Sequence, residues 1–351
     1  MNGQMSGPGS GPAGVPAAIA LSPILSARYR ASDLERIRLA APGTRLVGVS
    51  PEGIADDDLG DVEVLLRGWL PAEVFDRLIA RCPGLRWVHS ASAGVERVLT
   101  PGALARGLTI TNARGVFSRP IAEYVMMMVL AISRRLPGLL ELQRERTWQP
   151  LEGLEMREVT VGIVGLGSIG RAVGALASAF GCRVLATRRR LERPDEGVWT
   201  GGDAALTDAR PIEMAGGPGA LPHLLGESDF VVLALPLTAD TESFFGGAAF
   251  AQMKTGAWLI NVARGRLVDE RALERALREG RIGGAALDTF REEPLSPDSP
   301  LWSLPNVIIT PHTAWSSARA LDRSVELFCE NLVRFRDGRP LLNVVDPAVG
   351  Y

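Results

Sequence analysis

Cysteine is scarce in this chain of 351 residues. Cys82, Cys182 and Cys329 are odd in number and scattered, without the spacing of metal ligands. Such a set argues against a disulfide framework and favours a reducing compartment, so we expect a cytoplasmic protein. Residues 1–15 contain no basic region followed by an apolar core, so no secretory signal is expected. They are rich in Gly, Pro and Ser, and we expect residues 1–16 to form a disordered tail.

Long apolar runs and an excess of positive charge are also missing. The longest apolar run, Tyr124 to Ile132, is too short to cross a membrane and is flanked by polar residues. The formal net charge is −2, without the basic excess of a nucleic-acid-binding domain. We therefore expect neither a membrane nor a nucleic acid as partner. A hydrophobic content of 46% and this length predict a globular protein with two domains of ordinary size.

Glycine, in contrast, forms an ordered pattern between Glu158 and Arg190. A β-branched apolar run leads into a glycine turn, and a helix-period segment and a second apolar run follow. The glycines of the turn are Gly165, Gly167 and Gly170. In a dinucleotide fingerprint they allow, in this order, a tight turn, close approach of a pyrophosphate and packing of the helix on the strand. The free N–H groups of Ser168 and Ile169 would suit the diphosphate, whereas the alternative is a merely structural turn.

The end of the second strand of this pattern usually separates the two nicotinamide cofactors. NAD-preferring folds place an acid there for the ribose 2′-hydroxyl, but this chain has Thr187 followed by Arg188, Arg189 and Arg190. A guanidinium would bind a 2′-phosphate in bidentate fashion. NADP(H) is therefore the favoured cofactor, with NAD(H) as the alternative. A solvated basic loop is the simpler interpretation of the same arginines.

Before the glycine pattern, short apolar runs alternate with helix-like segments. This alternation predicts a parallel sheet of its own, in a domain that precedes the nucleotide site. The expected strands are Ala18–Leu21, Arg45–Val49, Val62–Leu66, Leu85–His89 and Leu108–Thr111. A long helix from Ser118 to Arg135 is expected as the crossover to the second domain, and the tail from Arg144 to Trp148 could be a dimerisation arm.

A glycine turn follows one of these strands and is expected to begin a short helix from Val95. The backbone N–H groups of Ala93, Gly94 and Val95 could hold a small carboxylate, although a plain turn is the commoner use of such a segment. His89, on the preceding strand, is interpreted as a core histidine rather than a base.

The second half of the chain completes a doubly wound sheet, in which ligands gather at the carboxyl ends of strands. The expected strands are Phe230–Pro236, Ala257–Val262, Gly284–Thr289 and Val307–Thr310. Chemically informative side chains stand at these ends, among them Arg264, Asp288, Glu293 and His312. The segment Pro194–Gly219 is interpreted as a surface excursion without recognisable chemistry.

With these residues in view, the chain resembles the D-isomer-specific 2-hydroxyacid dehydrogenases from about Ala17 to its end. The resemblance rests on the ordered motifs VGIVGLGSIG, LPLTADT, NVARG, DTFREEP, TPHTAW and NLVRFRDGRPLLNVV. The chain looks most like the glyoxylate/hydroxypyruvate reductase branch, helped by the Trp after the histidine. The basic TRRR departs from the acidic strand end that is common in the family and puts its usual NAD preference in doubt.

The resemblance implies an α/β fold in which a Rossmann domain is inserted into a flavodoxin-like substrate domain, both with doubly wound parallel sheets. Residues 118–317 would form the NAD(P)-binding domain, and residues 17–117 and 318–351 the substrate domain. The active site would be the cleft, and family members commonly form homodimers.

The resemblance also implies the chemistry, which is reduction of a 2-oxoacid to a D-2-hydroxyacid without a metal. His312 would protonate the developing oxyanion, and Glu293 would orient the imidazole and stabilise its charged form. Arg264 would bind the substrate carboxylate and polarise the carbonyl, with the N–H groups of residues 93–95 on the same carboxylate.

The remaining implied roles belong to the cofactor. Asp288 would face the nicotinamide carboxamide. The wall of the cofactor site would be formed by Pro236, Thr241, Val262 and Ala263.

Three alternatives are weighed against this interpretation. A formate dehydrogenase is disfavoured because that group carries Gln at the position of Glu293. Phosphoglycerate or another D-2-hydroxyacid dehydrogenase stays open. A dinucleotide-sensing scaffold of the co-repressor type is the alternative from another class, and turnover would separate it from an enzyme.

Overall fold

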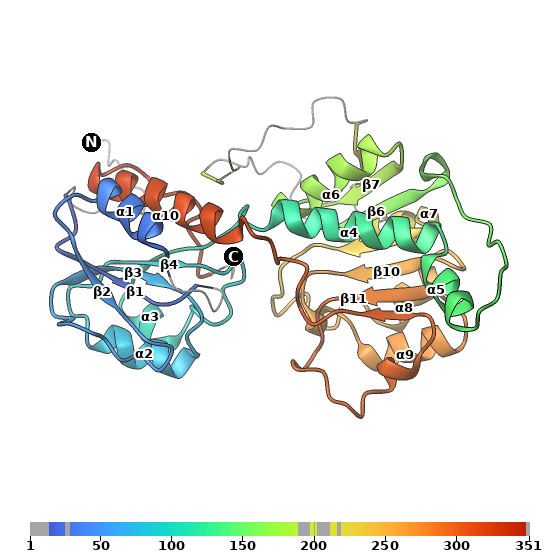
Figure 1. Cartoon of the computed structure of the whole chain (residues 1–351), viewed down its shortest axis with the longest axis horizontal. Coiled ribbons are helices and arrows are strands. Elements are labelled where there is room, and N and C mark those ends of the chain that lie inside the picture. The colour runs from blue at the N-terminus through green and yellow to red at the C-terminus, as the bar shows by residue number, and fades with distance from the viewer. Residues whose placement is uncertain are drawn as a thin grey trace, which may run out of the picture. The chain divides into compact units, whose positions relative to one another are not determined.

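The computed structural model divides the chain into two compact units, each built on a parallel sheet (Figure 1). The first unit contains residues 1–117, 194–202 and 317–351, and the second contains residues 118–193 and 203–316. The structure describes residues 14–24, 29–188, 197–199, 201, 211–215 and 219–348. Arg189, predicted as a cofactor contact, lies outside these residues, as does most of the N-terminal tail. The α/β fold class predicted from the sequence is confirmed.

The first unit has a five-stranded sheet in the order β2-β1-β3-β4-β5, with every pairing parallel. Its strands are β1 (Ala18–Leu21), β2 (Arg45–Gly48), β3 (Val62–Arg67), β4 (Trp87–Ser90) and β5 (Thr109–Thr111). Its helices are α1 (Ala31–Ala40), α2 (Ala72–Ala80), α3 (Pro101–Ala105) and α10 (Ala320–Arg336). The predicted strands of this half are therefore all present.

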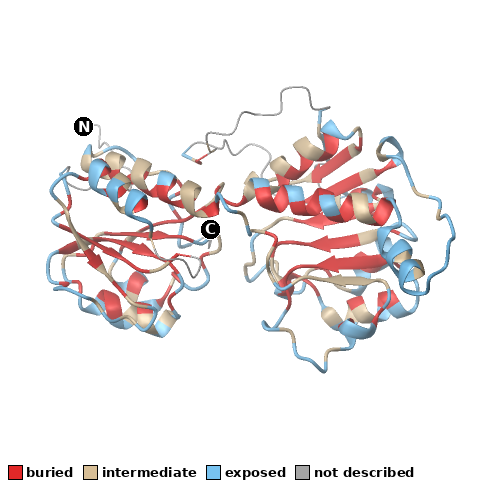
Figure 2. Cartoon of the chain, in the orientation of Figure 1, coloured by how far each residue is buried: buried red, intermediate tan, exposed pale blue. Residues whose placement is uncertain are grey.

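Alternating side chains of these strands serve two cores. In β1, Ala18 and Ala20 pack with the helices α2 and α3, whereas Ile19 and Leu21 pack with α1 and α10. Successive side chains of a strand point to opposite faces, and a sheet covered on both faces needs apolar residues at both sets of positions. The central strands β1 and β4 are accordingly buried from end to end, whereas the edge strand β2 is mostly half-buried (Figure 2).

A short piece of the excursion after residue 188 packs in the first unit. The Asn343 N–H donates to the Gly197 carbonyl at 2.7 Å, and the Asn343 side-chain oxygen accepts from the Trp199 N–H at 3.0 Å. The Asn343 amide also donates to the carbonyls of Asn112 and Arg114. The structural division thus gives residues 194–202 to the first unit, whereas the sequence-based division ran unbroken from 118 to 317.

The second unit has a seven-stranded parallel sheet in the order β12-β11-β10-β9-β6-β7-β8. Its strands are β6 (Thr160–Val164), β7 (Arg183–Thr187), β8 (Glu213–Ala215), β9 (Phe230–Leu233), β10 (Trp258–Asn261), β11 (Gly284–Leu287) and β12 (Val307–Ile309). The order reverses between β6 and β9, which makes the carboxyl ends of these strands the ligand-binding switch point of a Rossmann sheet.

Helices cover both faces of this sheet (Figure 1). The helices of this unit are α4 (Ser118–Ser133), α5 (Leu136–Arg144), α6 (Ser168–Ala179), α7 (Ala220–Glu227), α8 (Gly247–Gln252) and α9 (Glu270–Arg278), with 3₁₀ turns at Met156–Glu158, Gly265–Leu267 and Pro300–Ser303. α7, α8 and α9 share one core with Val164 and Leu185. α6 packs on β6 and β7, and α4 packs against α6. The Met stripe of α4 is mostly core, since Met126 and Met128 are buried, but Met127 is exposed.

Two local predictions were wrong. The segment Pro194–Gly219 is not only an excursion, because β8 adds an edge strand beside β7. No helix begins at Val95, since residues 96–98 form a turn and α3 begins at Pro101. Both errors concern short elements whose formation depends on a neighbouring segment rather than on local periodicity. Among the described residues, no helix is long and apolar enough to span a bilayer.

Candidate active site

The glycine turn connects β6 to α6, and two of its glycines are required by the fold. Gly165 has φ 102°, and a Cβ there would lie 2.7 Å from the Ala234 carbonyl oxygen. A Cβ on Gly170 would lie 2.2 Å from the Gly165 carbonyl oxygen. Any side chain at either position would therefore push α6 or β9 away from β6.

Gly167 differs from these two glycines because nothing in the fold demands it. Its backbone is extended, with φ −86°, and a Cβ there would meet no atom within 4 Å. It is the N-cap of α6, and no side chain caps the helix. Among the described residues, none accepts a hydrogen bond from the backbone N–H of Ser168, Ile169 or Gly170. Open space beside free N–H donors at a helix N-terminus fits a dinucleotide pyrophosphate.

Arg188 follows the last residue of β7 directly. Thr187 at the end of that strand accepts a hydrogen bond from the Gly165 N–H at 3.1 Å, so the strand end and the glycine turn are adjacent. Arg188 is half-buried. The position at which an acid would select NAD therefore carries a cation next to the fingerprint turn.

The predicted cofactor wall lies at the ends of β9 and β10. The Thr241 hydroxyl donates to the Pro236 carbonyl at 2.9 Å and accepts from the Thr238 N–H at 2.7 Å, so it closes the turn after β9. Val262 and Ala263 are buried directly after β10.

Arg264 follows Ala263 and is held by its own loop. The Asn261 side chain brackets this loop, accepting from the Ala263 N–H at 3.1 Å and donating to the Arg264 carbonyl at 3.0 Å. A Cβ on Gly265 would lie 1.9 Å from the carbonyl carbon of Phe290. Only glycine therefore allows the loop of Arg264 to lie against the loop that follows β11. Asn261 and Gly265 lie in the NVARG motif, but sequence reasoning assigned neither of them a role as a supporting residue.

Glu293 and His312 form a hydrogen-bonded pair. The His312 Nδ1 and the Glu293 Oε2 are 2.8 Å apart, and their side chains are 34% and 37% exposed. The other carboxylate oxygen of Glu293 accepts from the Phe290 N–H at 3.0 Å. With Nδ1 engaged by the carboxylate, Nε2 is the imidazole nitrogen that can serve a substrate.

Electrostatics keep Glu293 ionised. Burial by itself would raise the pKa of Glu293, but the hydrogen bonds from His312 and the Phe290 N–H, together with the positive charges of His312 and Arg264, lower the pKa below its usual range. Arg264, Glu293 and His312 thus come from three different strand ends, and the charges of Arg264 and His312 both act on the Glu293 carboxylate. The structure brings together the three residues that the sequence predicted as catalytic.

Asp288 is buried at the end of β11 and is 1% exposed. Its carboxylate accepts hydrogen bonds from the Thr310 hydroxyl and from the backbone N–H groups of Thr313 and Ala314. These donors stand on both sides of His312 in the chain. The resemblance implied that Asp288 faces the cofactor. In the structure, its carboxylate binds the segment that carries His312.

The loop of Ala93, Gly94 and Val95 belongs to the first unit. Among the described residues, none accepts a hydrogen bond from their backbone N–H groups, whereas the Ala93 carbonyl accepts from the Asn112 side chain at 2.9 Å. His89 lies on β4, fully buried, with Nδ1 2.8 Å from the Thr111 hydroxyl. Burial lowers the pKa of His89 to about 3, so this side chain is a neutral core histidine, as the sequence indicated.

Comparison with known proteins decides the family. Residues 126–314 match the D-isomer specific 2-hydroxyacid dehydrogenase, NAD binding domain. The chain belongs to this family. Membership makes it an NAD(P)-dependent oxidoreductase, in agreement with the open N-terminus of α6.

Individual relatives place the chain in the glyoxylate reductase branch. A glyoxylate reductase of Korarchaeum cryptofilum is 35% identical over 81% of this chain and 82% of its own length. A family member from Xanthobacter autotrophicus, solved in complex with NADPH and MES, has a TM-score of 0.81 at 31% identity and covers 95% of this chain and 99% of its own. An NADPH-dependent glyoxylate/hydroxypyruvate reductase of Sinorhizobium meliloti, solved with NADP and sulfate, has a TM-score of 0.78 at 30% identity, with coverages of 95% and 100%.

Proposed function

We propose that this dehydrogenase reduces glyoxylate, hydroxypyruvate or a similarly small 2-oxoacid to the D-2-hydroxyacid, preferentially with NADPH. The observation that carries the proposal is the 2.8 Å pair of His312 and Glu293, within electrostatic reach of Arg264. The relatives named above support the substrate class, since two of them bear the names of reductases acting on these acids.

The bound nicotinamide would supply the hydride, and the glycine turn of Gly165, Gly167 and Gly170 would hold its pyrophosphate. The chain's own part is to manage the negative charge that develops on the substrate oxygen. Glu293 holds the Nδ1 of His312 and stabilises the imidazolium, so that Nε2 can donate its proton to the oxyanion.

Arg264 would bind the substrate carboxylate. A guanidinium pairs with a carboxylate in bidentate fashion, which fixes the orientation of the carbonyl beside it. The N–H groups of Ala93, Gly94 and Val95 would donate to the same carboxylate, as their lack of acceptors among the described residues suggests. We place the enzyme in the cytoplasm, since Cys82, Cys182 and Cys329 are free thiols.

The direct test is steady-state reduction of a panel of acids with each nicotinamide cofactor. We expect the highest kcat/KM for glyoxylate or hydroxypyruvate with NADPH, and lower values for pyruvate and bulkier 2-oxoacids. A preference for phosphohydroxypyruvate would favour a phosphoglycerate dehydrogenase instead. Tight dinucleotide binding without turnover of any acid would favour the scaffold of the co-repressor type.

The pairing of Glu293 with His312 predicts a shift in the pH profile. In Glu293→Gln the imidazolium loses its carboxylate partner, so the proton donor is lost at lower pH and the alkaline limb of kcat for reduction moves down. Glu293 itself cannot cause that limb, because its lowered pKa lies below the ordinary value of about 4.3. Initial rates between pH 5 and 10 measure the limb, and an unmoved limb would show that the two side chains are not coupled.

We further propose that the enzyme is a homodimer that associates through α5 and its surroundings. None of the residues of α5 is buried, although Leu136, Leu139 and Leu140 are apolar, and Trp148 in the following arm is fully exposed. Contiguous apolar side chains on a monomer's surface are typical of an interface.

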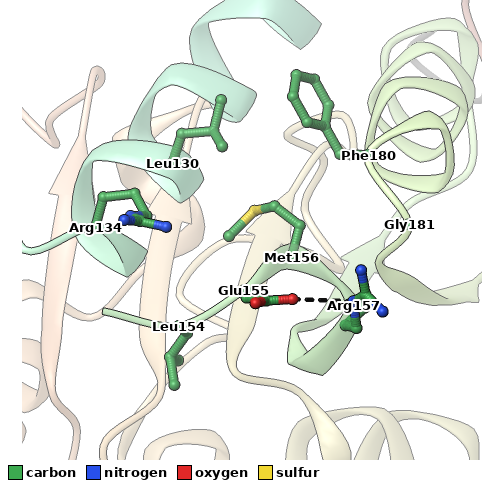
Figure 3. A pocket seen from close by; sticks show the side chains of 8 residues that line it. All are labelled: Leu130, Arg134, Leu154, Glu155, Met156, Arg157, Phe180 and Gly181. Carbon is green, nitrogen blue, oxygen red and sulfur yellow. Dashed lines mark ion pairs between the residues drawn. The ribbon is translucent and has the colours of Figure 1, made fainter. Parts of the chain in front are cut away.

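A groove of about 550 Å³ lies beside the C-terminal end of α4, the helix that α5 follows in the chain (Figure 3). Leu130 of α4, Met156 and Phe180 line it with apolar atoms, and the Glu155–Arg157 ion pair lies at its edge. An apolar surface with a charged rim suits a second copy of the same chain better than solvent.

A charge placed on α5 tests the dimer. Leu140→Glu should convert the dimer to a monomer at micromolar concentration, because a carboxylate would be buried without a partner in the interface. Glu141→Lys, whose side chain points away from the leucine stripe and pairs with Arg144, is the control and should leave the mass unchanged. Light scattering coupled to size-exclusion chromatography reads the mass, and a parent protein that already elutes as a monomer would refute the proposal.

A further inference from the structure

The buried carboxylate of Asp288 organises the segment that carries His312. Its Oδ1 accepts from the Thr310 hydroxyl at 2.6 Å and from the Thr313 N–H at 2.8 Å, and its Oδ2 accepts from the Ala314 N–H at 2.9 Å. Three donors from the residues that flank His312 thus converge on one carboxylate. Hydrogen bonds to a charged, buried acceptor are among the stronger ones, so this segment is tied firmly to the end of β11.

The segment needs such a restraint because of the backbone of His312. Its φ is 49°, in the left-handed region that residues with a Cβ seldom occupy, at a cost of about 1 to 2 kcal/mol. Its own N–H donates to the nearby Thr310 carbonyl, at 3.0 Å. Residues in this region persist where the surroundings hold them, and they cluster at functional sites.

A second residue, distant in sequence, extends the restraint. The Tyr124 hydroxyl of α4 lies 2.6 Å from the Thr310 hydroxyl. Thr310 has one hydroxyl proton and donates it to Asp288, so it must accept from Tyr124. Burial and, to a smaller extent, the nearby charge of Asp288 raise the pKa of Tyr124 to about 12. The phenol therefore keeps its proton and remains a donor throughout the pH range of the assay.

We propose that Tyr124, Thr310 and Asp288 form a directed hydrogen-bond chain that positions His312 for proton transfer. The proposal rests on the function proposed above for His312. Tyr124 and Thr310 touch neither substrate nor cofactor in this role and act through the loop, as positioning residues. Asp288 can take part in this chain and still contact the nicotinamide carboxamide, since each carboxylate oxygen has two lone pairs.

Substitutions at Thr310 separate the hydroxyl from the shape of the side chain. Thr310→Val keeps the shape and removes the donor to Asp288 and the acceptor for Tyr124, whereas Thr310→Ser keeps both. We expect kcat for glyoxylate to fall by about 10- to 100-fold in the valine variant, because a misplaced proton donor costs rate. The serine variant should stay within about threefold of the parent, and KM and the NADPH dissociation constant should change little in either variant.

Tyr124→Phe is the milder variant and removes a single hydroxyl oxygen. It should lower kcat several-fold, again without weakening NADPH binding measured by fluorescence titration. Equal losses in the valine and serine variants would overturn the proposal, because the hydroxyl would then be irrelevant. So would a rise in the NADPH dissociation constant in step with the loss of kcat, which would make Asp288 and its partners a cofactor site instead.

Hydrogen exchange tests the chain independently of turnover. Peptides covering residues 312–314 should exchange at least about tenfold faster in Thr310→Val than in the parent, because the Asp288 carboxylate that accepts from the Thr313 and Ala314 amides loses the donor that helps to hold it. Exchange should be unchanged in Thr310→Ser. Unaltered exchange in the valine variant would overturn the proposal. The two variants could show these exchange rates while the parent protein reduces no 2-oxoacid. That result would refute the proposed function alone and leave the hydrogen-bond chain intact.

Discussion

His312→Ala should lower kcat for reduction by at least about a hundredfold, the usual scale for loss of a general acid, while NADPH binds with near-parent affinity. The reason lies in the pair with Glu293, since the carboxylate holds Nδ1 and leaves Nε2 to donate to the oxyanion. Alanine removes the donor, and no other imidazole lies in this loop. Steady-state rates with saturating glyoxylate, together with fluorescence titration of NADPH, measure both quantities.

The chain offers a matched control for this experiment. His223 is an exposed histidine of α7, a helix that packs on β6, β7 and β8, whereas the triad follows β10, β11 and β12. His223→Ala should retain parent activity. If His312→Ala stayed within a few-fold of the parent, His312 would not be the proton donor.

The second large effect concerns the choice of cofactor. The unmodified enzyme should prefer NADPH over NADH by at least about tenfold in kcat/KM, which corresponds to about 1.4 kcal/mol. Arg188 stands directly after β7, where an acid would otherwise bind the ribose, and one charge-assisted hydrogen bond of about 1.5 to 3 kcal/mol is enough to decide the preference.

Arg188→Asp should reverse that preference, because it removes an attraction and adds a repulsion toward the 2′-phosphate. Raised salt should also weaken the NADPH advantage of the parent, since Arg188 is only half-buried. Arg278→Asp, on the exposed side of α9, makes the same change of charge elsewhere and should leave the ratio unaltered. Equal or better use of NADH by the parent would show that Arg188 does not bind the 2′-phosphate.

Much of the fold is local in origin and was therefore open to prediction. Apolar runs such as Ala18–Leu21 and Phe230–Leu233 became buried strands because a parallel sheet covered on both faces accepts side chains of one kind at every position. The triad was predictable for a related reason. Arg264, Glu293 and His312 each follow a strand of one parallel sheet, and all carboxyl ends of such strands meet at one edge.

Features that depend on distant partners escaped prediction. β8 pairs with the edge that β7 offers, and the buried Trp199 is held through its backbone by Asn343, 144 residues away. The short helix expected from Val95 did not form, although its glycine turn looked suitable in isolation.

The sequence by itself determined the family, the fold class, the glycine turn and the identity of the three proposed catalytic side chains, because periodicity and motif spacing are properties of consecutive residues. Only the tertiary structure decided how those side chains are held. The hydrogen bond from Tyr124 to Thr310 joins residues 186 positions apart, and the contact of Gly265 with Phe290 depends on the packing of two loops. Hydrogen bonds and close packing act through distance in space, which no local pattern of the chain records.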